Sequence, residues 1–83
     1  MASEADVLEA IRSIARTELE LEGPVQPSDD LLADLGLDSL GLTVLAVGLE
    51  NRYRVKLSQE DAVGLRTVED LAKLVVRRSE ASA

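Results

Sequence analysis

The chain has 83 residues, enough for one small domain, and it contains no cysteine and no histidine. Disulfides, thiolate catalysis, Cys/His zinc sites and a histidine general base are therefore excluded. The net charge of −7 repels nucleic acid and anionic membranes and favours partners with basic patches. No apolar run reaches the roughly 18 residues of a membrane span, and no signal peptide is evident, so we expect a cytoplasmic protein. Without Trp or Phe, so small a core encloses no deep catalytic pocket, and we expect no enzyme.

The first helix is predicted to follow a capping box, in which Ser3 and Asp6 each accept a hydrogen bond from the other's backbone N–H. Apolar residues then recur at helical spacing as far as about Leu19. They are Val7, Leu8, Ile11, Ile14 and Ala15. Gly23 and Pro24 end this helix and start a long loop. We expect the loop to be pinned to the core by its leucines, which are Leu31, Leu32, Leu35 and Leu37.

The central helix is predicted from Ser39 to about Arg54, and it is apolar on two sides. At 100° per residue one stripe contains Leu42, Leu45, Ala46, Leu49 and Tyr53. A second stripe, of Leu40, Val44 and Val47, lies on roughly the opposite side. So small a bundle leaves part of this second stripe exposed, and exposed apolar patches on small proteins tend to be contact sites.

Two further capping boxes predict the last two helices. Ser58 and Asp61 open a short helix that ends at Gly64, and Thr67 and Asp70 open the final one. The sequence therefore predicts an all-α four-helix bundle with a long loop between the first two helices and a short third helix. We expect a single domain over residues 1–83, ordered from about 4 to 78, with a frayed tail at 79–83.

The segment from Leu35 to Leu40 carries the most specific signal. It places Ser39 at the start of the central helix, directly after an acidic loop that contains Gly36. Unpaired backbone N–H groups and the positive end of the helix dipole suit an anionic group at that position. Ser39 could also have only a structural role, as the helix N-cap or as the first helical residue after an Asp38 cap. We expect Asp38 to be the N-cap whether or not Ser39 is modified. A hydrolase nucleophile elbow is excluded, because the spacing is G-x-x-S-x-G and no histidine exists to activate the serine.

This segment resembles the attachment site of acyl carrier proteins, whose signature is Asp-Ser-Leu at the start of the second of four helices. The resemblance spans nearly the whole chain, including the runs at 49–53 and 67–71. It implies that a separate phosphopantetheinyl transferase, using coenzyme A and Mg²⁺, attaches 4′-phosphopantetheine to Ser39. It further implies that Asp38 and Leu40 assist recognition by the transferase. The loop acids Asp29, Asp30 and Asp34 do not follow an EF-hand order, and we predict no metal site.

The sequence departs from the family along the central helix. Carrier proteins of fatty acid synthesis place acids two and five residues after the serine, where this chain has Gly41 and Val44. We therefore expect weaker docking to the basic patch of a partner enzyme, and docking instead through the apolar surface of this helix. By resemblance and exposure, the expected docking residues are Leu40, Thr43, Val44, Val47 and Glu50. Gly41 and Gly48 are unfavourable in a helix, which indicates a close approach of another helix or of the cargo.

We therefore predict a monomeric, non-catalytic carrier of acyl or polyketide-type cargo, with the cargo held as a thioester. Its partners are the transferase and pathway enzymes such as an acyltransferase or a ketosynthase, bound transiently, with no nucleic acid and no membrane. The departures in the central helix favour a specialised polyketide or mixed pathway over fatty acid synthesis. A free-standing aminoacyl or peptidyl carrier is the nearest alternative, although those domains read Gly-Gly-x-Ser-Leu. An unmodified helical adaptor that binds partners through the apolar stripe is the alternative of a different class.

Overall fold

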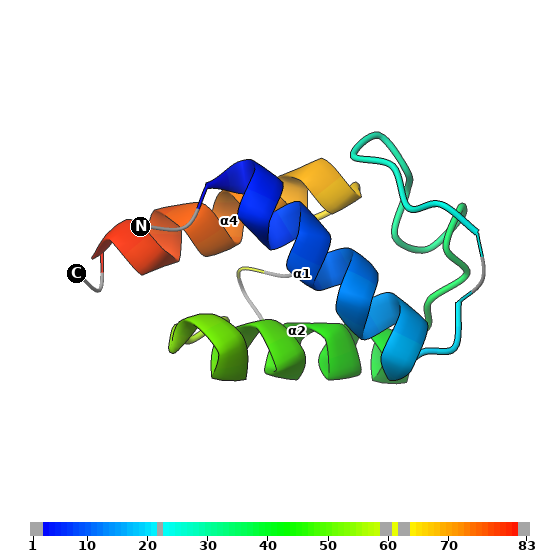
Figure 1. Ribbon diagram of the computed structural model, residues 1–83, viewed down its shortest axis with the longest axis horizontal. Helices are drawn as coiled ribbons and strands as arrows, with labels where there is room; N and C mark the ends of the chain where they lie inside the picture. Colours follow the sequence, from blue (N-terminus) through cyan, green and yellow to red (C-terminus); the bar gives the residue numbers. More distant parts are fainter. Residues whose placement is uncertain (1–2, 22, 59–60, 62–63, 82–83) are drawn as a thin grey trace.

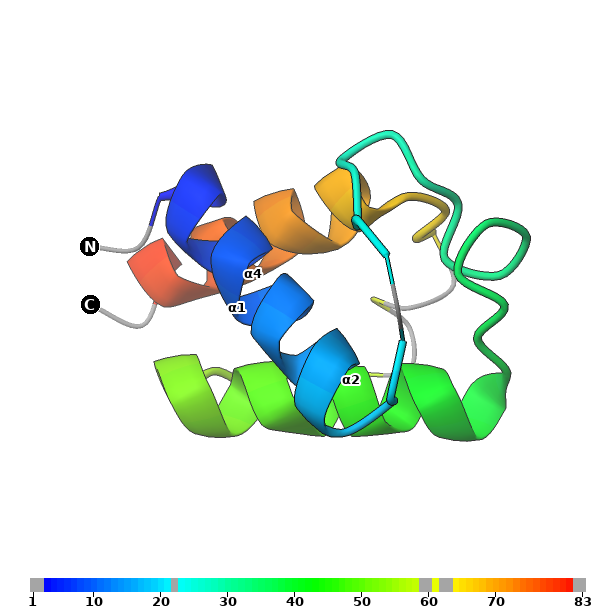
Figure 2. The same ribbon diagram turned by 45° about the vertical axis from the view of Figure 1, so that its right-hand side comes forward.

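The fold is all-α, as predicted. The computed structural model describes residues 3–21, 23–58, 61 and 64–81. Within these ranges it contains three helices and no strand: α1 (Glu4–Thr17), α2 (Ser39–Tyr53) and α4 (Val68–Ala81). α1 crosses the other two helices and contacts both, and the long loop closes one end of the molecule (Figures 1 and 2). None of the described helices is long and apolar enough to cross a membrane.

Capping boxes start the helices where the sequence predicts them. Ser3 Oγ accepts from Asp6 N at 3.2 Å, and Ser3 N donates to the Asp6 carboxylate at 3.2 Å. Thr67 and Asp70 exchange the same pair of bonds at the start of α4. The box at Ser58 is also formed, but residues 59–60 and 62–63 of the expected third helix lie outside the described residues.

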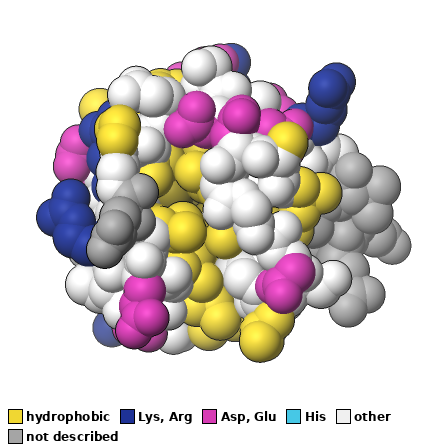
Figure 3. Space-filling model, turned by 90° about the vertical axis from the view of Figure 1, so that its right-hand side faces the viewer, with side chains coloured by type: hydrophobic (Ala, Val, Ile, Leu, Met, Phe, Trp, Pro, Cys, Tyr) yellow, Lys and Arg dark blue, Asp and Glu magenta, His cyan; other side chains and the backbone are white. Residues whose placement is uncertain are grey.

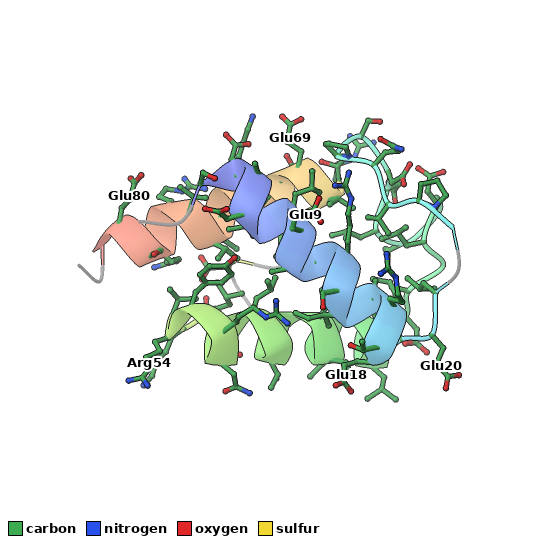
Figure 4. The ribbon with its side chains drawn as sticks, in the orientation of Figure 1. Glu9, Glu18, Glu20, Arg54, Glu69 and Glu80 are labelled. Carbon is green, nitrogen blue, oxygen red and sulfur yellow. The ribbon has the colours of Figure 1, made fainter. Side chains whose placement is uncertain are left out.

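Helix ends depart slightly from the prediction. α1 ends at Thr17 rather than about Leu19, and Glu18 N closes it by donating to Ile14 O at 2.8 Å. α2 ends at Tyr53 because Arg54 turns into the left-handed region, with φ 55°. Figure 4 shows Arg54 at the end of α2 away from the long loop. α4 continues three residues beyond Arg78, so residues 79–81 of the expected frayed tail are helical, and residues 82–83 lie outside the described residues.

One aliphatic core joins the helices and the loop. Burial removes apolar surface from water, which is the main favourable term in folding. The largest fully buried side chains are Ile11, Leu31, Leu45, Leu49, Val7, Val68 and Val75. The loop contributes Leu31 and Leu37 to this core, with Leu35 packed against it. The prediction for Leu32 is wrong, because its side chain is 57% exposed. The turn around it is held by the Asp30 carboxylate, which accepts from Leu32 N and Ala33 N, rather than by apolar contacts.

Backbone hydrogen bonds tie the long loop to the start of α4. Leu31 N donates to Arg66 O at 2.8 Å, and Val68 N donates to Asp29 O at 3.0 Å, around an antiparallel bridge between Asp30 and Thr67. On the other side, Arg12 Nε of α1 donates to Val25 O at 3.0 Å. The loop is therefore held from two helices, although it has no regular secondary structure.

The carboxylates of Asp30, Asp61 and Asp70 act as local caps. Asp30 Oδ1 accepts from Ala33 N at 2.8 Å and from Leu32 N at 2.9 Å. These backbone bonds lower the pKa of Asp30, and equivalent bonds lower the pKa of Asp61 and Asp70, because they favour the charged form. All three folded pKa values lie below the ordinary 3.8.

Acid should therefore destabilise this fold. The stabilisation from these carboxylates is complete above their unfolded pKa and is lost as the pH falls through the lower folded pKa. In a D30N/D70N variant the amide oxygens still accept the N–H bonds but do not titrate. Its free energy of unfolding, measured in urea by circular dichroism, should fall less between about pH 6 and about pH 3 than that of the native chain. An equal fall in both proteins would contradict this assignment.

Candidate functional site

Ser39 is the first residue of α2, and its side chain is exposed. Asp38 is the N-cap, with extended backbone (φ −101°, ψ −171°), and its Oδ1 accepts from Gly41 N at 2.8 Å. The first N–H groups of any helix have no acceptor within the helix. Asp38 takes the one at Gly41, which leaves those of Ser39 and Leu40 pointing out of the helix start beside the Ser39 hydroxyl. A phosphate on Ser39 would lie where these amides and the helix dipole favour negative charge.

The loop sets the direction from which the chain enters α2. Gly36 has φ +67°, a left-handed conformation that favours glycine. Immediately after it, Leu37 is buried, and its N–H donates to Leu31 O at 3.2 Å. Leu37 thus anchors the loop to the core two residues before Ser39. Figure 3 shows this end of the molecule, where hydrophobic side chains gather between acidic ones.

The two apolar stripes of α2 face in different directions, as predicted. Leu45 and Leu49 are buried in the core, whereas Leu40 is 71% and Val47 46% exposed. Val44 is half-buried. The second stripe is therefore largely a surface, and it begins beside Ser39.

Of the other two predicted docking residues, one is exposed and one is engaged within the fold. Thr43 is exposed, and its Oγ1 donates to the Ser39 carbonyl at 2.9 Å. Glu50 is half-buried, and its Oε2 accepts from Leu57 N at 3.0 Å. The only acid of α2 thus holds the segment that follows the helix.

The two glycines of α2 lie where other parts of the protein pack closely against the helix. A Cβ on Gly48 would lie 2.8 Å from Ile14 Cδ1, closer than real contacts allow, so α1 meets α2 here. A Cβ on Gly41 would lie 3.2 Å from Leu37 Cδ2, so the loop anchor packs against the first turn of α2. Protein, rather than cargo, accounts for both close approaches.

A groove of about 420 Å³ lies between α1 and α2. Its lining comes from both helices: Ile14, Thr17, Glu18, Thr43, Val44, Val47, Gly48, Asn51 and Arg52. Figure 4 shows Glu18 at the end of α1, beside α2. The sequence did not predict the α1 residues of this groove, because the pairing of helices distant in sequence leaves no local motif.

The carboxylates of the loop acids accept hydrogen bonds from backbone N–H groups of the same loop. Asp29 Oδ2 accepts from Gln26 N at 2.8 Å, and Asp34 Oδ2 accepts from Asp30 N at 2.6 Å. Throughout the described part of the chain, no three His, Cys, Asp or Glu residues come together in a set that could hold a metal ion. These carboxylates shape the loop that leads to Ser39.

Comparison with known proteins identifies related proteins over most of the chain. A family model described as a phosphopantetheine attachment site matches residues 9–75. The chain is 34% identical over 80 residues to the meromycolate extension acyl carrier protein of Mycolicibacterium aurum, covering 96% of this chain and 76% of that protein. It is 32% identical to the protein of the same name from Mycobacterium leprae, covering 96% and 64%. A solved structure described as an acyl carrier protein from Mycobacterium tuberculosis matches with a TM-score of 0.78 at 31% identity, covering 86% of this chain and 96% of that one.

The N-cap bond of Asp38 should stabilise the fold independently of its charge. D38A removes the acceptor for Gly41 N and should lower the free energy of unfolding by about 1 kcal/mol. D38N keeps an acceptor at the same place and should stay within about 0.5 kcal/mol of the native chain. Urea unfolding of the three proteins measures both values. A D38N variant as unstable as D38A would show that the hydrogen bond is not the stabilising feature.

Proposed function

Because the chain belongs to the acyl carrier protein family, whose members bear covalent 4′-phosphopantetheine, we propose that Ser39 is its attachment residue. The observation that carries this proposal is the exposed Ser39 hydroxyl on the first residue of α2, directly after the Asp38 cap. The nearest other hydroxyl of the helix, on Thr43, is bonded to the Ser39 carbonyl.

The residues around Ser39 fit the phosphate end of this group. Attachment forms a bond from Ser39 Oγ to the phosphorus of coenzyme A that bears the pantetheine, and it releases adenosine 3′,5′-bisphosphate and the hydroxyl proton. The chain has no histidine to take that proton, and the transferase is proposed to supply the base. The amides at the start of α2 and the helix dipole then stabilise the new phosphodiester. Once attached, the arm supplies a thiol that holds an acyl group as a thioester.

Asp38 and Leu40 flank Ser39 and are proposed to be read by the transferase. Asp38 Oδ1 is bound to Gly41 N, which fixes the carboxylate beside the reacting hydroxyl, where Mg²⁺ and coenzyme A must approach. Leu40 is 71% exposed and gives the transferase an apolar contact one residue further on. Both features are fixed by the backbone, so they are present before any partner arrives.

Pathway enzymes are proposed to dock along the exposed stripe of α2. Leu40, Thr43 and Val47 are exposed, and Val44 contributes its accessible part. Glu50 contributes less than the sequence suggests, because its carboxylate holds Leu57 N. A contact with few charges favours brief apolar docking, which suits a non-catalytic carrier that must be released by each enzyme in turn.

For the cargo, we propose polyketide-type acyl groups passed between an acyltransferase and a ketosynthase. The non-acidic surface of α2 supports this choice over a carrier of housekeeping fatty acid synthesis. A second candidate follows from the relatives, which are named for meromycolate extension: a growing long acyl chain. Loading the modified chain with malonyl and with long acyl groups, and measuring which one candidate ketosynthases elongate, separates the two. Loading by an amino-acid adenylating enzyme would instead favour the aminoacyl carrier.

Modification should require Ser39 alone. After incubation with coenzyme A, Mg²⁺ and a broad-specificity transferase, the native chain should gain the mass of one phosphopantetheine, and S39A should gain none. T43A removes the next hydroxyl of the same helix and should still be modified. Intact-mass spectrometry reads all three. Failure of the folded native chain with several transferases, or modification of S39A, would overturn the assignment.

Leu40 should act in recognition rather than in chemistry. L40N should raise the KM of the transferase for the chain about tenfold, since part of the roughly 1.5–3 kcal/mol from burying a leucine is lost. The kcat should change little. L32N removes a comparably exposed leucine of the loop and should leave KM unchanged. Equal effects of the two substitutions would show that Leu40 has no special part in recognition.

A further inference from the structure

We infer that Arg54 and Lys56, at the far end of α2, form a cationic contact that binds carboxylates on the docking face of the ketosynthase. The inference rests on the proposed docking along α2 and adds the charge that the enzyme presents and the direction in which it docks. Figure 4 shows Arg54 at the end of α2 opposite the long loop, with its side chain extending away from the other two helices.

The Arg54 side chain does not serve the fold. Its backbone lies in the left-handed region, with φ 55°, where glycine is the least strained residue. The bond that closes the helix runs from Arg54 N to Glu50 O, so it belongs to the backbone and does not need an arginine. The side chain is exposed and makes no hydrogen bond or ion pair within the described part of the chain. An arginine retained at this strained position indicates a contact outside the chain.

Lys56 places a second cation close to Arg54. It lies two residues further on, within about 7 Å along the chain. Val55 between them is buried, which fixes this segment to the core, whereas Lys56 is exposed and has no ion pair among the described residues. Glu50, the only acid of α2, does not neutralise either cation, because its Oε2 accepts from Leu57 N at 3.0 Å. Two positive charges therefore lie side by side on a backbone segment that is held in place.

Arg54 continues the exposed stripe of α2. Counted from Leu40, the residues four, seven, eleven and fourteen positions further on share one face of a helix. They are Val44, Val47, Asn51 and Arg54. Leu40, Val47 and Asn51 are exposed, as Arg54 is. The stripe therefore starts beside Ser39, is apolar over its first half and ends in a positive charge.

The charge changes sign between the two ends of this stripe. Asp38 and the phosphate attached to Ser39 make the first end negative, whereas Arg54 and Lys56 make the far end positive. Arg54 lies fifteen residues beyond Ser39, about 22 Å along the helix axis. A standard interface covers about 800 Å² of each partner, which is about 28 Å across if it is square. One enzyme can therefore contact both ends at once.

Opposite charges at the two ends fix the orientation of that enzyme. With its active-site entrance over Ser39, its carboxylates must lie about 22 Å away to meet Arg54. The reversed orientation would place the same carboxylates against the phosphate, and like charges brought together disfavour that complex. The cationic contact thus selects the orientation in which the thiol enters the active site.

The test measures elongation of the modified, loaded chain by the ketosynthase that accepts its cargo. R54G should raise the KM for the chain about threefold and R54G/K56Q about tenfold, with kcat unchanged, as expected for one and two partly exposed ion pairs. Glycine suits φ 55°, so R54G should remain folded, which circular dichroism in urea verifies. R77Q removes the same charge from an exposed position of α4 and should leave the KM unchanged.

Salt and charge reversal identify the contact as electrostatic. The ratio of the KM of R54G to that of the native chain should fall towards one in 0.5 M NaCl, because salt screens exposed charges. R54E should raise the KM further than R54G. Lysine in place of one ketosynthase carboxylate about 22 Å from the active-site entrance should then restore the KM of R54E.

Three outcomes would overturn the inference and leave attachment at Ser39 intact. They are an equal KM for the native chain and R54G/K56Q, an equal rise in R77Q, and a lower stability of R54Q in urea with no change in KM. The last would show that the cation serves only the C-terminal end of the helix dipole. A native chain that gains no phosphopantetheine, or that no ketosynthase elongates, would instead defeat the proposed function.

Discussion

The hydrogen bonds between the long loop and the start of α4 are the constraint on which the site depends. The loop has no regular secondary structure, yet bonds such as that from Leu31 N to Arg66 O hold it against another helix. With the loop backbone held in this way, Leu31 and Leu37 are buried in the core, and Leu37 lies directly before Asp38. Asp38 then caps α2 and presents Ser39 to solvent. Ser39 is thus positioned by contacts that lie far away in sequence.

The composition of α2 explains how one helix serves both the fold and its partners. Leu45 and Leu49 are buried, while Leu40 and Val47 remain at the surface. An exposed apolar stripe lowers solubility and gives nothing to the core, so it needs a functional reason. Gly48 serves the packing of α2 against α1, because its lack of a side chain lets α1 approach closely. This contact forms the base of the groove between the two helices, whose lining begins at Thr43, one turn from Ser39.

Local patterns predicted much of this structure. Hydrogen-bonding pairs three residues apart, such as Ser3 with Asp6, marked helix starts because they act within one turn. The helical period separated the two stripes of α2, and Asp38 was expected as a cap. The sequence did not predict that Leu32 stays exposed, that Arg12 holds Val25, or that α1 forms one wall of the groove. These features arise from tertiary contacts between distant segments, for which the sequence carries no periodic signal.

Peptide mapping of the modified protein tests the central claim most directly. Trypsin cleaves after Arg16 and Arg52 and releases Thr17–Arg52, a peptide with Ser28, Ser39 and two threonines. Fragmentation by tandem mass spectrometry should place one phosphopantetheine on the residue between Asp38 and Leu40. The group at Ser28, at a threonine or in another peptide would contradict the account, because none of those residues combines a free hydroxyl with the capped start of α2.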